Sequence, residues 1–302
     1  IASRAGAIIK NMEFVQFHPT VMFKVRTKGR AFLISEAVRG YGAHLRNWMG
    51  ERFMHSYDRR GELASRDIVS RAIHEEMNKS EEDHVFLDCT HLDHIEFKNK
   101  FPNIYAQCLT ENIDPSKDWI PVRPAAHFMC GGIEVNSFGQ TNIKGLYACG
   151  ECSYTGLHGA NRLASNAILE ALVYAHQIYL SLLHEKIEEG GVTNTDDVPV
   201  IGDDPDTKDW KEIREELRVI MDEKVGIVRT DRGLLDARKQ IDELIGQLFS
   251  SSLHQNFVSV EVQETLNMLE VSLLIVSQAL GRQKNAGCHY NAGHHIIQQN
   301  PT

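Results

Sequence analysis

Residues 188–206 divide the chain into two parts of different character. This stretch is acidic and rich in glycine and proline, a composition typical of a linker. Before it, short apolar runs alternate with glycine and proline turns, which indicates strands mixed with helices. After it, apolar residues recur at helical spacing. A chain of 302 residues can form two or more compact units, so we expect a mixed α and β part followed by a helical domain.

The bulk composition excludes several classes of function. A net charge of −9 argues against a nucleic-acid partner, because phosphates attract basic surfaces. No apolar run reaches the roughly 18 residues that a membrane helix needs, and no secretory signal is visible. Six cysteines in a chain of this length do not indicate a disulfide scaffold. We therefore expect a cytoplasmic protein that binds neither nucleic acid nor membrane.

Local patterns predict the elements of the first part. Residues 1–10 resemble a short helix, and residues 12–20 alternate like a strand that ends at a proline turn. Residues 62–79 predict a helix with Ser65 as its N-cap. Residues 162–184 predict a long helix that is buried on several sides, because apolar residues occupy most of its circumference.

Three amphipathic stripes predict the helices of the second part. Short loops between them indicate a small three-helix bundle. The stripes are Trp210, Ile213, Leu217 and Ile220; Leu234, Ile241, Leu244, Ile245 and Leu248; and Val262, Leu266, Leu269, Leu273, Val276 and Leu280.

Cys149 and Cys152 form a Cys-x-x-Cys pair that invites a metal or redox interpretation. A metal site of this kind needs a second ligand pair, but the nearest further cysteine, Cys130, is single. A redox dithiol should open a helix directly after a strand, whereas the predicted helix begins only at residue 162. We therefore predict no metal site, and we interpret Cys149 as a buried strand residue.

Two arginines are placed where a helix disfavours them. Arg66 and Arg162 each follow a predicted N-cap, and a cation in the first helical turn costs roughly 0.3 kcal/mol or more. An anion bound at both helix starts would offset this cost. Ordinary ion pairs with Asp67 and Glu170 are the alternative.

Three further polar residues follow apolar segments. His18 and His127 each stand at a proline or glycine break, where site residues tend to emerge from a core. Glu151 follows a glycine at the end of an apolar run and could bind a ligand hydroxyl such as that of a ribose or ribityl group. A satisfied core-edge histidine and an exposed turn acid are the alternatives. The chain has no Gly-x-Gly-x-x-Gly or Walker A loop, so the residues alone predict no pyrophosphate site.

A series of motifs, taken in order, resembles the succinate dehydrogenase/fumarate reductase flavoprotein family over nearly the whole chain. Within that family, Leu157 and Ala164 are similar to the aspartate-oxidising members, since the respiratory enzymes more often have Val and Gly there. The motifs are MEFVQFHPT, LISEAVRGYGAHLRN, GERFM, ELASRDIVSRAI, HFMCGGIEVN, GLYACGE and TGLHGANRLASNAILEAL.

The resemblance implies an α+β fold and a chain that starts after an N-terminal FAD-binding half, so that most FAD contacts are missing. The implied parts are the end of an FAD-binding segment (1–20), a capping domain (21–122), a returning FAD-binding segment (123–186), a linker (187–206) and a C-terminal helical domain (207–302).

The resemblance also implies a role for each candidate site residue. Arg66 corresponds to an acid/base arginine, for which Glu36 is the neighbouring carboxylate. Arg162 and His127 are expected to bind one carboxylate of the substrate, and His18 with the Ser35 hydroxyl the other. The residues implied to contact the flavin are Glu151, Asn166, Ala167 and Ile168.

The implied activity is the oxidation of L-aspartate to iminoaspartate by non-covalent FAD, with oxygen or fumarate as electron acceptor. This reaction is the first step of de novo NAD biosynthesis, and quinolinate synthase is an implied partner. A fumarate reductase or succinate dehydrogenase flavoprotein subunit, acting on fumarate or succinate, is the alternative within the family. A non-catalytic helical interaction module is the alternative outside it.

Overall fold

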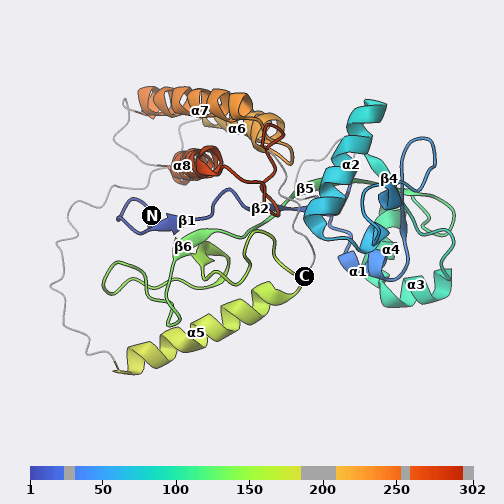
Figure 1. The fold of residues 1–302 in the computed structure, drawn as a ribbon, viewed down its shortest axis with the longest axis horizontal. Coiled ribbons are helices and arrows are strands. Elements are labelled where there is room, and N and C mark those ends of the chain that lie inside the picture. The colour runs from blue at the N-terminus through green and yellow to red at the C-terminus, as the bar shows by residue number, and fades with distance from the viewer. Residues whose placement is uncertain (24–30, 185–208, 253–258, 295–302) are drawn as a thin grey trace. The chain divides into compact units, whose positions relative to one another are not determined.

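The computed structural model describes residues 1–23, 31–184, 209–252 and 259–294 (Figure 1). The chain divides into two compact units. The main unit comprises Ile1–Val15 and Met129–Thr302, and the inserted unit comprises Gln16–Phe128. The linker expected at 187–206 lies outside the described residues. In the described ranges, no helix combines the length and the apolar character that crossing a membrane would require.

The inserted unit is built on a four-stranded sheet. Its strand order is β2(Val15–Met22), β5(Ile120–Met129), β4(Val85–Asp88) and β3(His44–Arg46). β4 pairs antiparallel with both neighbours, so that Leu87 lies opposite Leu45 on β3 and Ile120 on β5. All three side chains are fully buried, and they form the centre of this unit's apolar core. β2 continues through Pro19, so the predicted strand end at that proline is wrong.

Four helices complete the inserted unit: α1(Glu36–Gly40), α2(Arg66–Ser80), α3(His94–Lys100) and α4(Pro102–Thr110). α2 buries Val69, Ala72 and Ile73 against the core, at the i, i+3 and i+4 spacing of one helical face. The predicted helix over 62–79 is confirmed with a later start, because a short 3₁₀ helix precedes it. Ser65 stands at the N-cap, but its hydroxyl donates to the Asp67 side chain at 2.6 Å and does not cap the backbone.

The main unit contains a small three-stranded sheet of order β1(Ile9–Lys10), β6(Gly132–Glu134) and β7(Ser153–Tyr154). Two glycines allow these strands to approach closely. A Cβ atom on Gly131 would lie 2.2 Å from the Asn11 carbonyl oxygen, and one on Gly132 would lie 2.5 Å from that of Cys152. Residues 2–6 form turns, so the helix predicted over residues 1–10 is wrong.

α5(Asn166–His184) carries an apolar face that the described chain leaves exposed. Its start is four residues later than predicted, and the prediction that it is buried on several sides is wrong. No other described element covers the outward apolar side chains. These are Ile168, Leu169, Leu172, Val173, Tyr179, Leu182 and Leu183.

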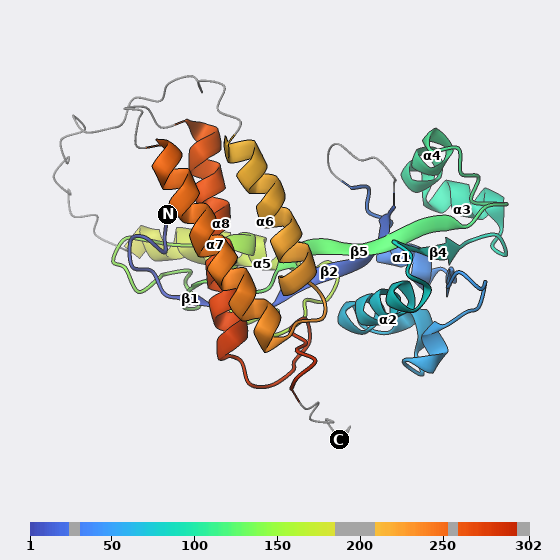
Figure 2. The same ribbon diagram turned by 90° about the horizontal axis from the view of Figure 1, so that it is seen from above.

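α6(Asp209–Val225), α7(Asp231–Ser252) and α8(Val260–Gly281) lie side by side in both views (Figures 1 and 2). Each predicted apolar stripe falls on one of these helices. The stripes meet in a common core with Ile213, Leu217, Leu234, Ile241 and Leu269 at its centre.

Arg229, between α6 and α7, joins distant segments of the main unit and is fully buried. Its guanidinium donates to the carbonyl oxygens of Val225 at 3.1 Å and of Glu13 at 2.8 Å. It also lies 3.0 Å from Nδ1 of His289. Burial lowers the pKa of Arg229 to about 10, so the group is still charged at neutral pH and His289 must accept its hydrogen bond.

This contact makes the stability of the main unit depend on pH. Burial, and next the charge of Arg229, lower the pKa of His289 to about 3. Above the ordinary histidine pKa of about 6.5, both the folded and the unfolded chain hold this residue neutral. As the pH falls below that value, only the unfolded chain gains the proton, so the free energy of unfolding decreases until about pH 3.

We expect the variant His289→Asn to remove this dependence, because its amide oxygen can still accept from Arg229 but does not titrate. Between roughly pH 6 and pH 4, the wild type should lose up to about 1.4 kcal/mol per pH unit more than the variant. Urea unfolding at several pH values measures the difference, since the contribution of the carboxylates is common to both proteins. Parallel curves of stability against pH would contradict the prediction.

Candidate active site

Arg66, the first residue of α2, lies at the centre of the candidate site in the inserted unit. Its side chain is 9% exposed, and its Nε donates to a Glu36 carboxylate oxygen at 2.6 Å. Its NH1 donates to the Gln16 amide oxygen on β2 at 2.9 Å. Three elements therefore hold this guanidinium in one orientation, and charge-assisted bonds of this kind are stronger than neutral ones.

A second buried guanidinium, that of Arg39 on α1, lies close to this pair. Its NH2 is 3.9 Å from the same Glu36 oxygen that Arg66 contacts. Burial is the main cause that lowers the pKa of Arg39; Glu36 opposes this effect, and the charge of Arg66 adds to it. Glu36 is therefore the ion-pair partner of both Arg39 and Arg66.

The remaining charges around this pair do not balance it. The nearby carboxylate of Glu62 is engaged by Arg52, with Nε donating at 2.9 Å and NH2 at 3.0 Å. Taken by themselves, these five described side chains, three guanidinium groups and two carboxylates, carry one net positive charge.

Asp67 does not pair with Arg66, so the ordinary ion pair considered from the sequence is wrong for this arginine. Asp67 accepts instead from Ser65 at 2.6 Å and from Arg71 at 2.9 Å. Ser35 is the N-cap of α1, and its Oγ accepts from the Ala37 N–H at 3.3 Å. The Ser35 hydroxyl therefore lies directly beside Glu36.

His18 and His127 lie close together on the adjacent strands β2 and β5. Their ring centroids are 5.3 Å apart and the rings meet edge to face. His18 is buried, and its Nδ1 accepts from the Thr20 N–H at 3.3 Å, whereas His127 is exposed. Gln16, the partner of Arg66, precedes His18 by two residues and shares its face of the strand. One face of β2 therefore carries both His18 and Gln16, the residue that accepts from Arg66.

Arg162 lies in the main unit, in the loop of residues 155–165 that leads into α5. The helix begins at Asn166, so Arg162 is outside the first helical turn and the helix-dipole argument for it is wrong. The loop is tied to α5 by buried polar contacts: His158 Nε2 is 2.8 Å from a Glu170 carboxylate oxygen, and the Thr155 hydroxyl donates to the other. Arg162 itself is 7% exposed.

The buried thiol of Cys130 contacts this loop. A hydrogen bond with Cys288 is the main cause that lowers the pKa of Cys130; burial opposes it, and the backbone N–H and the charge of Arg162 lower it further. Cys288 in turn donates its backbone N–H to the Ala160 carbonyl oxygen at 2.9 Å. No sequence pattern pairs Cys130 with Cys288, because the two are far apart along the chain.

Glu151 lies on a short 3₁₀ helix, Gly150–Cys152, and its side chain is exposed. One of its carboxylate oxygens accepts from the Met129 N–H at 3.0 Å. A Cβ atom on Gly150 would lie 3.8 Å from that of Ala171, so this turn packs against α5. The first residues of α5 are Asn166, Ala167 and Ile168, the predicted flavin contacts.

Cys149 and Cys152 lie on either side of Gly150 and Glu151. Both are free thiols; Cys152 is exposed, and its Sγ donates to the Cys149 carbonyl oxygen at 3.4 Å. Cys149 is half-buried and precedes the 3₁₀ helix, so its interpretation as a buried strand residue is wrong.

The structure therefore brings the predicted residues together in two groups. His18, Ser35, Glu36, Arg66 and His127 belong to the inserted unit, while Glu151, Arg162 and Asn166–Ile168 belong to the main unit. Sequence reasoning missed Gln16 and Arg39 in the first group. For Gln16 a signal existed, namely its spacing of two residues from His18 on a strand.

Two family models match the sequence. The FAD binding domain model matches residues 1–168, and the fumarate reductase flavoprotein C-terminal model matches residues 214–296. The L-aspartate oxidase 2-a of Nicotiana tabacum, a chloroplastic protein, is 42% identical over 99% of this chain and 50% of its own length. The L-aspartate oxidase of Acinetobacter baylyi is 43% identical over 99% of this chain and 55% of its own length. The chain thus spans about half the length of these relatives.

Solved structures share this fold. An E. coli quinol fumarate reductase flavoprotein is 28% identical with a TM-score of 0.80, covering 99% of this chain and 56% of that one. A Mycobacterium smegmatis Sdh1 structure is 31% identical with a TM-score of 0.71, covering 98% of this chain and 52% of that one. The chain therefore belongs to the FAD binding domain family, in the flavoprotein group that includes L-aspartate oxidases and fumarate reductases.

Proposed function

We propose that a protein containing this chain oxidises L-aspartate to iminoaspartate with FAD, and passes the electrons to oxygen or fumarate. The similarity to L-aspartate oxidases supports the substrate. The observation that carries the proposal is the sharing of one carboxylate, that of the half-buried Glu36, by two buried arginines, Arg66 and Arg39. A dicarboxylate is the kind of ligand that two such cations attract.

The residues of the main unit fit an FAD group in part. Glu151 is exposed, and Met129 uses only one of its carboxylate oxygens, so the other can accept a hydrogen bond from a ribose or ribityl hydroxyl. The turn that carries it packs against α5, whose first residues, Asn166–Ile168, we propose as backbone contacts to the flavin. When bound, the flavin supplies the acceptor for the hydride that leaves the substrate C2.

The exposed apolar face of α5 supports the same proposal. Burying a leucine side chain stabilises a protein by about 1.5–3 kcal/mol, so an exposed row of such residues favours a covering partner. We propose that the remaining part of the FAD-binding domain in the longer protein provides this cover.

The chain's own residues suggest how a dicarboxylate could be held and protonated. We propose that His18, His127 and the Ser35 hydroxyl bind substrate carboxylate, and that Arg162 binds carboxylate as well. An arginine is a poor acid by itself because its pKa is above about 12. Glu36 accepts from Arg66 Nε at 2.6 Å. We propose that, when fumarate is reduced, the proton that the guanidinium donates is replaced through this carboxylate.

The architecture can be interpreted in the same terms. We propose that residues 21–122, which lie in the inserted unit, form the capping domain, that residues 123–186 form the returning FAD-binding segment, and that α6–α8 form a C-terminal three-helix bundle. A supply of iminoaspartate to quinolinate synthase in the cytoplasm, as the first step of NAD biosynthesis, completes the proposal.

The direct test is an assay of the whole protein that contains this chain, reconstituted with FAD. We expect aspartate and oxygen to yield iminoaspartate and hydrogen peroxide, with little oxidation of succinate. If the protein oxidises succinate, and aspartate yields neither peroxide nor iminoaspartate, the result would favour a succinate dehydrogenase or fumarate reductase subunit instead.

The acid/base role of Arg66 predicts a loss of turnover in Arg66→Lys. A lysine keeps the charge but cannot bond Glu36 and Gln16 as the planar guanidinium does. We expect kcat for fumarate reduction to fall by about 100-fold or more, the usual size of an acid/base contribution. Bound flavin, followed by its absorption, should be retained.

Arg71→Lys is the matched control for this variant. Arg71 lies on the same helix and donates to Asp67, outside the Glu36 cluster. Its kcat should equal that of the wild type. An unchanged kcat in Arg66→Lys would exclude the acid/base role.

The carboxylate-binding role of Arg162 predicts a loss of kcat/KM in Arg162→Leu. Removing a hydrogen bond between charged groups costs about 1.5–3 kcal/mol, so kcat/KM for aspartate should fall by about 10–150-fold. Arg218→Leu, on the exposed surface of α6, is the control and should leave kinetics unchanged. Equal kinetics for both variants would mean that Arg162 does not bind the substrate.

A further inference from the structure

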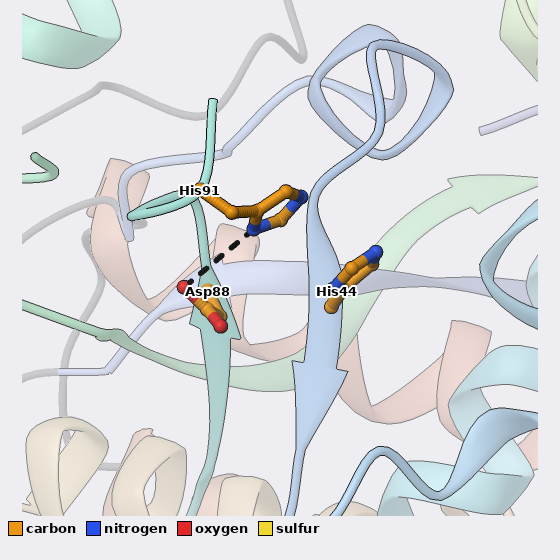
Figure 3. Close-up of side chains that lie close together, drawn as sticks. All are labelled: His44, Asp88 and His91. Atoms are coloured by element: carbon orange, nitrogen blue, oxygen red, sulfur yellow. Dashed lines mark ion pairs between the residues drawn. The ribbon is translucent and has the colours of Figure 1, made fainter. Parts of the chain in front are cut away.

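His44, Asp88 and His91 lie together at the edge of the four-stranded sheet (Figure 3). One ligand atom from each side chain lies within 4.8 Å of the others. We propose that these three residues form a structural binding site for a divalent transition-metal ion of the zinc class.

The backbone fixes two of the three side chains. His44 on β3 lies directly opposite Asp88 on β4, so both project from the same face of the sheet. The next pair, Leu45 and Leu87, points to the other face and is fully buried in the core. Because a slip in register would expose these leucines, the relative position of His44 and Asp88 is strongly specified.

Hydrogen bonds hold the Asp88 carboxylate in place. Its Oδ2 accepts from Arg46 Nε at 2.6 Å, and its Oδ1 accepts from the Thr90 N–H at 2.9 Å and the Thr90 hydroxyl at 2.7 Å. The side chain is 3% exposed. Because Oδ1 already accepts two hydrogen bonds, a metal ion that binds this oxygen would replace one of the two Thr90 contacts, while Arg46 remains bonded to Oδ2.

The orientation of His91 supplies the second observation. Its Nε2 lies 2.9 Å from the Gly42 carbonyl oxygen. A carbonyl oxygen only accepts, so Nε2 carries the proton and Nδ1 of the neutral ring presents a lone pair. A metal-bound histidine is held by the same kind of contact, in which the second ring nitrogen donates to a backbone carbonyl.

His91 Nδ1 lies 4.0 Å from Asp88 Oδ1, and the dashed line in Figure 3 marks this contact. Two acceptors without a proton between them repel each other, and this distance is too long for a hydrogen bond. Zinc binds nitrogen and carboxylate oxygen at about 2.0–2.2 Å, so one ion can bridge a gap of this size after a small movement.

The ligand set identifies the class of ion. The His44 and His91 rings are stacked with centroids 4.1 Å apart, so a rotation of one ring brings a second imidazole nitrogen to the same point. Two imidazoles and one carboxylate suit Zn²⁺ and its neighbours, whereas Mg²⁺ and Ca²⁺ prefer all-oxygen sites. His91 is 37% exposed at the side chain, which leaves room for water as a further ligand.

The test uses metal-free protein containing the full chain, titrated with Zn²⁺ by calorimetry and with Co²⁺ by visible absorption. Exposed His94, three residues after His91, provides the matched control in His94→Ala. We expect His44→Ala and His91→Ala each to lose one bound equivalent, with affinity at that site reduced by about 100-fold or more, beyond the usual effect of an outer-shell change. His94→Ala should bind like the wild type.

Two measurements distinguish metal bound at this site from metal bound elsewhere on the chain. Histidines near the C-terminus can capture metal, so the decisive quantity is the difference in stoichiometry between wild type and variants. Zn²⁺ should also raise the melting temperature of the wild type and not that of His91→Ala. Because His91 is exposed, we expect the His91→Ala variant to fold without metal. If wild type, His44→Ala and His91→Ala bind Zn²⁺ equally, or if the wild type binds none, the proposal is wrong.

Discussion

The main unit depends on the burial of one guanidinium. Backbone carbonyl oxygens and a neutral histidine, rather than a hydrogen-bonded carboxylate, stabilise the charge of Arg229 within the described residues. Removing such a group would leave buried acceptors unsatisfied, and each of these costs about 1–3 kcal/mol. The segment around His289 is held by this contact, and Cys288 beside it donates to Ala160 in the loop that carries Arg162. The position of a proposed substrate residue therefore rests on a buried charge far away in sequence.

The buried face of a helix could be predicted from the sequence where its apolar residues form a single stripe at helical spacing. The three apolar stripes beyond residue 206 fall on α6, α7 and α8, because their spacing leaves each helix a single apolar face. α5 shows the limit of the same reasoning. Its apolar circumference indicates burial, yet periodicity does not say what covers a helix, and the described chain leaves Leu172 and its neighbours exposed.

The candidate site could be predicted residue by residue but not as an arrangement. His18 and His127 stood out at breaks after apolar runs, but only strand pairing brings their rings to 5.3 Å. Arg39 carries no signal in the sequence and Gln16 only its spacing from His18, and the two residues gain a role through contact with Glu36 and Arg66. The His44, Asp88 and His91 cluster escaped notice for the same reason, since its members are joined by a cross-strand pair and not by spacing along the chain.

Of the two arginines that the sequence singled out, only Arg66 bears the cost of opening a helix. Arg66 does open a helix, and opposing the macrodipole there costs about 0.3–1 kcal/mol. A charge-assisted bond to Glu36 is worth about 1.5–3 kcal/mol, so this bond by itself outweighs the cost and no bound anion is needed to explain the residue. The charge that remains is what favours a dicarboxylate ligand. With Glu36 shared between Arg39 and Arg66, and Glu62 engaged by Arg52, one positive charge is left over in a partly buried region. Water solvates such a charge poorly there, which is why we propose an anionic substrate as the ligand that neutralises it.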